Sequence, residues 1–363
     1  MSSLNETPRS DRIRIAFFGL RNAGKSTLIN EFTGRKIAIV SDIPGTTTDP
    51  VSKAMEIHPL GPCQIIDTAG LDDDADGLGR LRVEKSLAEL KLADVAVWVD
   101  DGRTSPLRKT VEDECSAREI TFLFHRREDG AEKLKSRIAA LDLKASETGL
   151  LDGLVERGDS VLCVCPIDSS APKGRLILPQ VQLIRECLDR GVWVEVCQPE
   201  QLRARGAGAS WDLVVTDSQA FKEVAAALPA SQALTSFSIL FARRKGDIDV
   251  YLEGLKSLKN LKDGDRVLIL EGCAHHRQCD DIGSVKIPKA VKALSGADVS
   301  FDFDNGTANV GDYRLVVQCG SCMLTRRETM RRIEEARAAG VAVVNYGMVL
   351  AKAAGLDEKR VVR

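Results

Sequence analysis

Two groups of residues, far apart in the chain, have the types and spacing that chemistry requires. Near the start, Gly19-Leu-Arg-Asn-Ala-Gly-Lys25-Ser26 is a complete phosphate-binding loop. In the last hundred residues, Cys273-Ala-His275 and Cys319-Gly-Ser-Cys322 place thiols and an imidazole at spacings typical of metal ligands. This pairing predicts that the state of a bound nucleotide is coupled to a group bound by the thiols.

The phosphate-binding loop follows a strand expected over 13–18 and begins a helix near Lys25, which is the context that such a loop requires. Its curled backbone turns successive N–H groups toward the phosphates. Lys25 is expected to reach the β- and γ-phosphates, and the Ser26 hydroxyl is expected to bind Mg²⁺. The nucleotide-binding residues predicted in this loop and helix are Gly19, Asn22, Ala23, Gly24, Lys25, Ser26 and Thr27.

Two further segments have the composition of nucleotide switches. Asp67-Thr-Ala-Gly70 ends an expected strand, so Asp67 can offer a carboxylate to Mg²⁺ and Gly70 an amide to the γ-phosphate. Gly45-Thr-Thr-Thr-Asp49 can offer a hydroxyl to the same metal; Thr47 is the predicted ligand, with the threonines on either side as close competitors. Loops of this kind are ordered by the γ-phosphate and Mg²⁺ and released on hydrolysis.

The motifs D-x-P-G-T-T-x-D and D-T-A-G resemble those of the tRNA-modification and Era-like branch of translation-factor GTPases. The resemblance implies that Asn22 helps to hold a K⁺ ion beside the phosphates; a plain turn residue is the alternative. Leu71 stands where Ras-like proteins carry the glutamine that orients the attacking water. Intrinsic hydrolysis is therefore expected to be slow, with K⁺ in place of an arginine finger and Lys25, Asn22 and Thr47 as catalytic residues.

The segment expected to recognise the base departs from the usual pattern. Where N-K-x-D would follow a strand over 120–124, the chain has His125-Arg-Arg-Glu128. Glu128 is predicted to pair with the guanine edge and the Arg126 stem to flank the base, whereas His125 cannot reproduce an asparagine amide. GTP is retained as the nucleotide because of the resemblance, and weaker discrimination of guanine is expected.

The C-terminal thiols are expected to converge, because Cys273 and Cys319 each follow a predicted strand and the carboxyl ends of parallel strands lie along one edge of a sheet. Thr325-Arg-Arg-Glu328 is typical of a capping box, and the positive end of its helix would favour an anionic thiolate cluster. The chemistry leaves two interpretations open: a structural Cys₃His zinc site or an iron–sulfur cluster. His275 is either a ligand or a hydrogen-bonding loop residue, and Cys279 is a less favoured extra thiol.

Resemblance to a family separates these two interpretations. The phosphate-binding loop combines with A-P-K-G-R-L-I-L-P-Q over 171–180, T-D-S-Q-A-F over 216–221 and E-G-C-A-H-H-R-Q-C-D-D-I-G-S-V-K-I-P over 271–288. Over almost its whole length the chain resembles the GTPase of the [FeFe]-hydrogenase maturation system. The resemblance implies a scaffold and carrier for the two-iron subcluster precursor of the hydrogenase, with two radical-SAM maturases and the apo-[FeFe]-hydrogenase as partners and a homodimer as the assembly.

The same resemblance implies a [4Fe–4S] cluster bound through three cysteines, here Cys273, Cys319 and Cys322. The family usually has a histidine directly before C-x-x-C, whereas this chain has Gln318. An amide is a poor iron ligand, so the fourth coordination position is expected to be open, or held by His275 or an exchangeable group. An open position is where a bridging precursor could attach.

The expected fold class is α/β, because strands alternate with helix-length amphipathic stretches and so indicate mostly parallel sheets. The turn at His58-Pro-Leu-Gly-Pro62 joins two strands directly and predicts one antiparallel edge strand. Three domains are expected: a Ras-like P-loop GTPase domain over 1–165, a dimerisation domain over 166–262 and a cluster-binding domain over 263–363. The middle domain is expected to contain a strand over 235–241.

Composition argues against several other classes of protein. With 51 basic and 53 acidic residues, the chain lacks the basic field of nucleic-acid binders. Its aromatic content of only 4% also argues against a surface on which single-stranded bases stack. This disfavours the alternative function, a tRNA-modification or ribosome-assembly GTPase with a structural zinc site. The absence of a signal peptide or a long apolar run predicts a cytoplasmic protein without a membrane partner. Ten cysteines in that compartment are expected to be reduced thiols or metal ligands.

Overall fold

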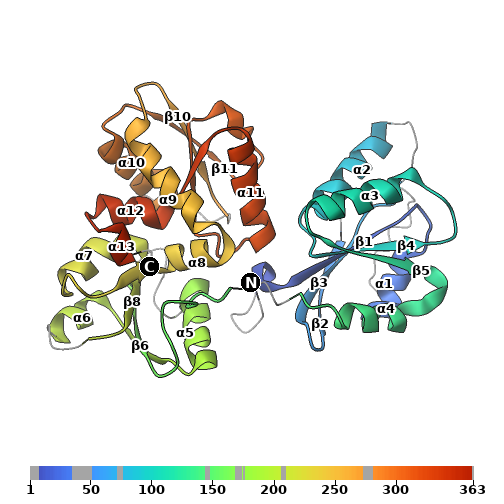
Figure 1. Cartoon of the computed structure of the whole chain (residues 1–363), viewed down its shortest axis with the longest axis horizontal. Coiled ribbons are helices and arrows are strands. Elements are labelled where there is room, and N and C mark those ends of the chain that lie inside the picture. The colour runs from blue at the N-terminus through green and yellow to red at the C-terminus, as the bar shows by residue number, and fades with distance from the viewer. Residues whose placement is uncertain are drawn as a thin grey trace. The chain divides into compact units, whose positions relative to one another are not determined.

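The chain forms two compact units, over Met1–Ser146 and Glu147–Arg363 (Figure 1). A computed structural model describes residues 8–34, 51–71, 77–143, 148–167, 174, 176–205, 210–272 and 281–361. Each unit is built from layers of helices packed on mostly parallel sheets. Within the described ranges, no helix is both long and apolar enough to cross a membrane.

The first unit is built on a five-stranded sheet in the order β2-β3-β1-β4-β5. Neighbouring strands are parallel except β2 and β3, which pair antiparallel on either side of the predicted turn. The strands are β1 (Ile13–Phe18), β2 (Val51–Ile57), β3 (Gly61–Asp67), β4 (Val95–Asp100) and β5 (Thr121–Arg126). The described helices of this unit are α1 (Lys25–Thr33), α2 (Gly77–Leu90), α3 (Pro106–Ala117) and α4 (Gly130–Ala139).

β1 is the central strand, and its alternate side chains are buried on both faces of the sheet. Ile15 and Phe17 belong to the core on the side of α1 and α4, whereas Ala16 and Phe18 belong to the core on the side of α2 and α3. Burial on both faces explains why the strand is an almost continuous apolar run. The predicted α/β class, with a P-loop domain and one antiparallel pair, is confirmed.

The second unit contains two four-stranded parallel sheets, in the orders β7-β6-β8-β9 and β11-β10-β12-β13. The strands are β6 (Ser160–Val164), β7 (Trp193–Cys197), β8 (Leu213–Thr216), β9 (Leu234–Ser236), β10 (Arg266–Leu270), β11 (Ser300–Asp304), β12 (Leu315–Gln318) and β13 (Ala342–Asn345). The α-helices in its described part are α5 (Leu178–Arg190), α6 (Pro199–Arg205), α7 (Phe221–Ala226), α8 (Phe237–Lys245), α9 (Ile248–Ser257), α10 (Ile287–Ser295), α11 (Arg326–Ala338), α12 (Tyr346–Ala353) and α13 (Glu358–Val361). α9 and α10 lie on one side of the C-terminal sheet and α11 on the other (Figure 1).

The strand β6 belongs to the second unit, although the expected first domain boundary placed it in the GTPase domain. A boundary at 165 would leave β6 in the GTPase domain, but β6 pairs with β7 and β8 in the middle sheet. The first unit ends instead at Ser146, after α4. Because β6 is a short apolar strand like its predecessors, its sequence carries no sign of which sheet it joins.

The prediction of a strand over 235–241 is wrong beyond its first two residues. β9 ends at Ser236, and the following apolar residues form the first turns of α8. The Ser236 hydroxyl accepts a hydrogen bond from the Ile239 N–H at 3.3 Å and so caps the helix. The run is buried almost all round, which removes the periodicity that distinguishes a helix from a strand.

The two sheets of the second unit share one hydrophobic core. Its largest buried cluster includes Leu162 and Val214 of the middle sheet together with Val267 and Val316 of the C-terminal sheet. α9 lies so close to β13 that a Cβ on Gly254 would be 1.8 Å from the Val343 carbonyl oxygen. The expected middle and C-terminal domains therefore pack as one body, and a glycine in α9 sets their closest backbone approach.

Gly254→Ala should destabilise the second unit, although alanine ordinarily stabilises a helix interior by about 1 kcal/mol relative to glycine. The added methyl group must displace the β13 backbone, so we expect a loss of about 3 kcal/mol. Urea unfolding would measure it, with the exposed neighbour Glu253→Ala as a control expected to change stability by no more than about 0.5 kcal/mol. A stabilised Gly254→Ala variant would contradict this close packing.

Candidate functional site

The phosphate-binding loop joins β1 to α1, and α1 begins at Lys25 as predicted. The Lys25 side chain is buried, and its Nζ donates hydrogen bonds to the carbonyls of Gly19 at 3.2 Å and Leu20 at 3.0 Å. The ammonium therefore lies within the curl of the loop. A phosphate group bound there would replace neutral carbonyl partners by charged ones.

The D-T-A-G segment approaches the phosphate-binding loop directly. The Leu71 N–H donates to the Gly19 carbonyl at 3.1 Å, and a Cβ on Gly70 would be 2.8 Å from the Arg21 Cα. Only glycine permits this approach, which leaves the Gly70 backbone beside the loop as the sequence predicted. The Leu71 side chain is buried in the core with Phe18, so it cannot orient a water molecule.

Asn22 has a left-handed backbone conformation, with φ of +61°, and its side chain is exposed. Asparagine tolerates this conformation better than most residues, so the geometry is compatible with the turn-residue interpretation. It leaves the side chain accessible to an ion as well. The role of Asn22 in holding K⁺ stays a prediction.

Two predicted Mg²⁺ ligands lie side by side in the structure. The Ser26 hydroxyl donates to Asp67 Oδ2 at 2.6 Å, while the buried Asp67 Oδ1 has no hydrogen-bond partner among the described residues. Burial raises the pKa of Asp67, whereas the Ser26 hydrogen bond and the Lys25 charge lower it, and the net direction is upward. A divalent cation between these oxygens would compensate the buried carboxylate, so they fit Mg²⁺. The third predicted ligand, Thr47, lies outside the described residues.

The residues predicted to recognise the base lie at the end of β5 and directly after it. Arg126 and Glu128 are exposed, and their side chains pair with each other at 3.6 Å. Arg127 lies against the phosphate-binding loop instead: a Cβ on Gly24 would be 3.0 Å from Arg127 Nε, and the guanidinium pairs with Glu31 at 2.7 Å. Sequence reasoning missed Arg127, since counting from N-K-x-D placed it at the variable position.

His125 itself is fully buried at the end of β5. Burial lowers its pKa, so the imidazole is neutral at physiological pH. Base contacts by Arg126 and Glu128 stay predictions.

The cysteine loop follows β12 and precedes α11, as the sequence predicted. The Cys319 N–H donates to the Leu270 carbonyl at 3.0 Å, which continues the pairing of β12 with β10 by one residue. The loop then turns through Ser321, whose φ is +59°. The Thr325 hydroxyl accepts from the Glu328 N–H at 3.2 Å, which confirms Thr325 as the helix cap. The Glu328 carboxylate pairs with Arg331 and Arg332 at 2.9 Å, so the second half of the predicted capping box is not formed.

The end of β10 meets the cysteine loop. A Cβ on Gly272 would be 3.1 Å from Cys319 Sγ, so the residue immediately before Cys273 touches the first thiol of the C-x-x-C pair. Cys273, His275 and Cys279 themselves lie outside the described residues. Within the part that the structure describes, no group of three or more His, Cys, Asp and Glu side chains is placed to hold a metal ion.

The surroundings of Cys319 suit a metal thiolate. Burial raises the pKa of its thiol, whereas backbone N–H groups of Ser321 and Gly272 and the Arg332 charge lower it; the net direction is upward. N–H groups directed at a sulfur are a common outer contact of iron–sulfur ligands. A bound metal would supply the additional positive charge that a buried thiolate needs.

Gln318, at the position of the usual histidine, is fully buried. Its Nε2 donates to the Ser321 hydroxyl at 3.1 Å, and its buried Oε1 has no partner among the described residues. Asn345, also buried, donates weakly from Nδ2 to the Cys319 carbonyl at 3.4 Å. The Gln318 amide therefore holds the Ser321 side chain and the Asn345 amide holds the loop backbone, roles for which their sequence positions gave no signal.

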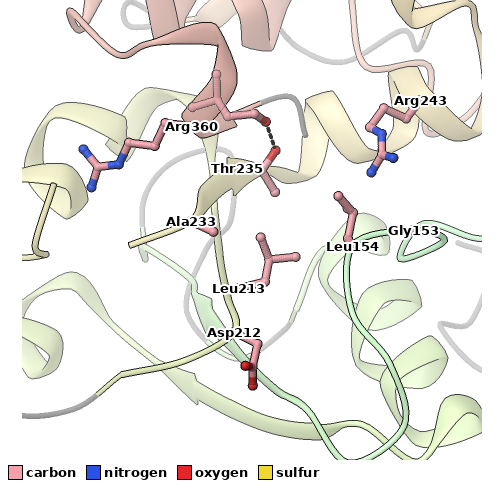
Figure 2. A pocket seen from close by; sticks show the side chains of 9 residues that line it. Gly153, Leu154, Asp212, Leu213, Ala233, Thr235, Arg243 and Arg360 are labelled. Carbon is pink, nitrogen blue, oxygen red and sulfur yellow. Dashed lines mark hydrogen bonds between the residues drawn. The ribbon is translucent and has the colours of Figure 1, made fainter. Parts of the chain in front are cut away.

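A separate cavity of about 120 Å³ lies in the second unit (Figure 2). Asp212 and Ala233, which precede β8 and β9, place it at the amino ends of these strands. Arg243 and Arg360 lie on opposite sides of it (Figure 2). None of the residues that line it belongs to the cysteine loop, so the cavity is not part of the sulfur site.

Comparison with known proteins gives partial relatives for the first unit. The tRNA modification GTPase MnmE of Hamiltonella defensa subsp. Acyrthosiphon pisum (strain 5AT) is 41% identical over 93 residues, or 26% of this chain. The corresponding MnmE of Pectobacterium carotovorum subsp. carotovorum (strain PC1) gives the same values. The chain spans about a fifth of the length of these curated relatives, since the match covers 20% of each.

Solved structures resemble the chain only weakly. A probable GTP-binding protein engB has 21% identity and a TM-score of 0.25, with 34% of this chain and 96% of that chain covered. A variant of Aquifex aeolicus Era bound to GDP and AlF₄⁻ has 16% identity and a TM-score of 0.27, with 90% of this chain and 98% of that chain covered. Scores this low establish no common overall arrangement.

Family models account for most of the chain. One described as a 50S ribosome-binding GTPase matches residues 14–126, which hold the phosphate-binding loop and the predicted Mg²⁺ ligands Ser26 and Asp67. Models described as the hydrogen maturase F dimerization domain and tetramerization domain match residues 150–246 and 249–363. These two models follow the GTPase domain in the sequence and together match more than half of the whole chain. The chain therefore belongs to the hydrogen maturase F family of hydrogenase maturation GTPases.

Proposed function

We propose that this protein is a GTP-hydrolysing scaffold that binds a [4Fe–4S] cluster and carries the two-iron subcluster precursor to an apo-[FeFe]-hydrogenase. The observation that carries the proposal is the junction of β10 and β12, where Gly272 touches Cys319 Sγ. The last described residue before Cys273 therefore lies at the first thiol of the C-x-x-C pair, which supports Cys273, Cys319 and Cys322 as three cluster ligands. Membership of the hydrogen maturase F family supports the role in hydrogenase maturation.

The chain's own residues would hold the cluster in a particular way. Cys319 and Cys322 come from a loop fixed by Gln318 and Asn345, while Cys273 comes from the neighbouring strand end. When bound, the cluster would supply redox-active iron with one coordination position open to the carried precursor. The Gln318 amide nitrogen is engaged with Ser321, and its amide oxygen is a poor iron ligand, so Gln318 is not proposed to occupy that position. His275 is the alternative occupant.

The nucleotide half of the proposal concerns K⁺. The Leu71 side chain is buried, and the water-orienting group of Ras-like proteins is therefore missing from its usual place. We infer that a K⁺ ion held by Asn22 supplies positive charge at the transferring phosphate, while Lys25 and the Mg²⁺ ligands Ser26, Thr47 and Asp67 hold the other phosphate oxygens. The partners proposed for this GTPase are the two radical-SAM maturases and the hydrogenase, in the cytoplasm.

A homodimer is proposed through the edge strand β7. β9, the other edge of the middle sheet, is joined to α13 by a hydrogen bond from the Thr235 hydroxyl to the Val361 carbonyl at 2.6 Å. β7 instead exposes Trp193 to 75%, and Leu188 on the adjacent α5 is 62% exposed. An edge strand that exposes apolar side chains is suited to pairing with the same strand of a second copy. The match to the dimerization and tetramerization domains supports oligomerisation.

Single replacements of Cys273, Cys319 or Cys322 by serine should each remove most of the bound iron and leave GTP hydrolysis largely unchanged, because the nucleotide site lies in the other unit. Iron and sulfide analysis after anaerobic reconstitution, with phosphate release in parallel, would measure both. Cys115→Ala, in the core of the first unit, is the matched control and should retain iron.

Loss of iron from Cys279→Ser, with one of the three named cysteines dispensable, would show that this ligand set is wrong. A colourless wild-type protein containing zinc would favour the alternative, a tRNA-modification or ribosome-assembly type GTPase with a structural zinc site.

GTP hydrolysis should be faster in K⁺ than in Na⁺ by roughly tenfold, which corresponds to about 1.4 kcal/mol of transition-state stabilisation. Asn22→Ala should abolish the difference between the two salts without unfolding the domain, because the side chain is exposed. Steady-state phosphate release at equal ionic strength would measure this. Equal wild-type rates in the two salts would show that neither K⁺ nor Asn22 takes part in hydrolysis as proposed.

Trp193→Arg should halve the particle mass, because a charge in place of an exposed apolar side chain at a β7–β7 contact disfavours pairing. Light scattering after size-exclusion chromatography would give the mass, with the exposed Lys109→Glu as the charge-change control. An unchanged mass for Trp193→Arg would place the dimer contact elsewhere.

A further inference from the structure

A tyrosine hydroxyl is buried close to the cysteine loop. Tyr251 lies near the start of α9 and is fully buried, and its hydroxyl oxygen has no hydrogen-bond partner among the described residues. The helix cap sets the position of the ring, because the Asp247 carboxylate accepts hydrogen bonds from the N–H groups of Asp249 at 3.1 Å and Val250 at 3.2 Å. The hydroxyl is therefore held in place without a partner of its own.

The hydroxyl of Tyr251 faces the segment that contacts the cysteine loop. A Cβ on Gly246 would be 2.8 Å from the Tyr251 hydroxyl oxygen. Directly before this glycine, Lys245 Nζ donates hydrogen bonds to the carbonyls of Cys322 at 3.2 Å and Leu324 at 2.7 Å. The residues that surround the tyrosine hydroxyl are thus bonded to the backbone of the cysteine loop.

The Cys319 thiol belongs to the same region. A Cβ on Gly272 would be 3.0 Å from Leu324 Cγ and 3.1 Å from Cys319 Sγ, so Leu324 lies beside this thiol. Burial raises the pKa of the Tyr251 hydroxyl, and the charge of Cys319 raises it further. The Arg332 charge acts on both groups and lowers the pKa of each. Electrostatic effects of this kind fall off with distance, so they place the hydroxyl and the thiol near each other.

The Tyr251 hydroxyl has an energetic cost that packing does not explain. Phenylalanine would fill the same space without a polar atom to bury. A hydroxyl that has left water and gained no hydrogen bond destabilises the folded protein. The thiolate and sulfide sulfurs of an iron–sulfur cluster accept hydrogen bonds, and these bonds help to set its reduction potential. A cluster at Cys319 would therefore supply the acceptor that this hydroxyl lacks.

We propose that the Tyr251 hydroxyl donates a hydrogen bond to a sulfur of the bound cluster and gains its partner only when the cluster is present. The inference rests on the proposed function, because it requires a cluster at Cys319. It adds a positioning residue from α9 to a site whose proposed ligands come from the loops after β10 and β12. Tyr251 is not an iron ligand in this proposal.

The test compares full-length wild-type protein with Tyr251→Phe, which removes the oxygen atom alone. Tyr313→Phe is the matched control: Tyr313 precedes β12, at the opposite end of the strand from the cysteine loop, and its hydroxyl accepts a hydrogen bond from Arg266 at 3.4 Å. Thermal unfolding is measured on the iron-free proteins. After anaerobic reconstitution with iron and sulfide, the rate of iron loss to a chelator and the midpoint potential of the cluster are measured.

Iron-free Tyr251→Phe should unfold at the wild-type temperature or above it, because a buried hydroxyl without a partner has been removed. The reconstituted variant should lose iron roughly tenfold faster than wild type, as is typical when an outer contact of a metal site is lost. Its midpoint potential should move to a lower value, because a hydrogen bond to sulfur favours the reduced, more anionic cluster. Tyr313→Phe should match wild type in iron loss and in potential.

A lower unfolding temperature of iron-free Tyr251→Phe, or its failure to fold, would show that the hydroxyl already has a partner within the protein and would overturn the proposal. An unchanged midpoint potential would overturn it as well, whatever the rate of iron loss. A wild-type protein that binds no iron would instead refute the proposed cluster function, which is a different result from iron-loaded proteins that behave alike.

Discussion

The register between neighbouring parallel strands is the constraint on which both candidate sites depend. In the first unit, Phe17 of β1 pairs with Asp67 of β3, so the phosphate-binding loop and D-T-A-G leave the sheet at the same edge. In the second unit, Leu270 of β10 pairs with Gln318 of β12, so Gly272 and Cys319 leave together. A shift of one residue in either pair would turn the site side chains to the opposite face of the sheet. Backbone hydrogen bonds in the sheet therefore bring together residues that are distant in the chain.

The second unit differs from a simple series of domains. Its two parallel sheets share a core, and α8 begins directly after β9 but supports the cysteine loop beyond β12. Partly buried polar groups reinforce this connection: the Ser238 hydroxyl donates to Asn345 Oδ1 at 3.3 Å, and Lys286 Nζ donates to Gln219 Oε1 at 2.6 Å. Such groups are costly to bury unless each has a partner, so they specify one relative placement of the two sheets. The cysteine loop consequently has the rigidity of the whole unit.

Three positions differ from the patterns of related proteins, and each has a physical explanation in this fold. Leu71 belongs to the core on the α2 and α3 side, where glutamine would bury an amide. His125 is buried and neutral at the end of β5, and Arg127 lies beside Gly24. Gln318 bonds to Ser321 and so stabilises a left-handed residue in the cysteine loop.

The sequence by itself determined the α/β class, the start of α1 at Lys25, the antiparallel pair and the cap at Thr325, because these follow from local periodicity, glycine placement and capping chemistry. Only the tertiary structure decided that β6 joins the middle sheet and that residues after Ser236 form a helix, since buried apolar segments lose the periodicity that distinguishes such choices. It also decided the positions of Arg127 and Lys245, which local rules would place in solvent. Their surroundings come from elements distant in the chain, and a side chain's burial depends on those neighbours rather than on its own sequence.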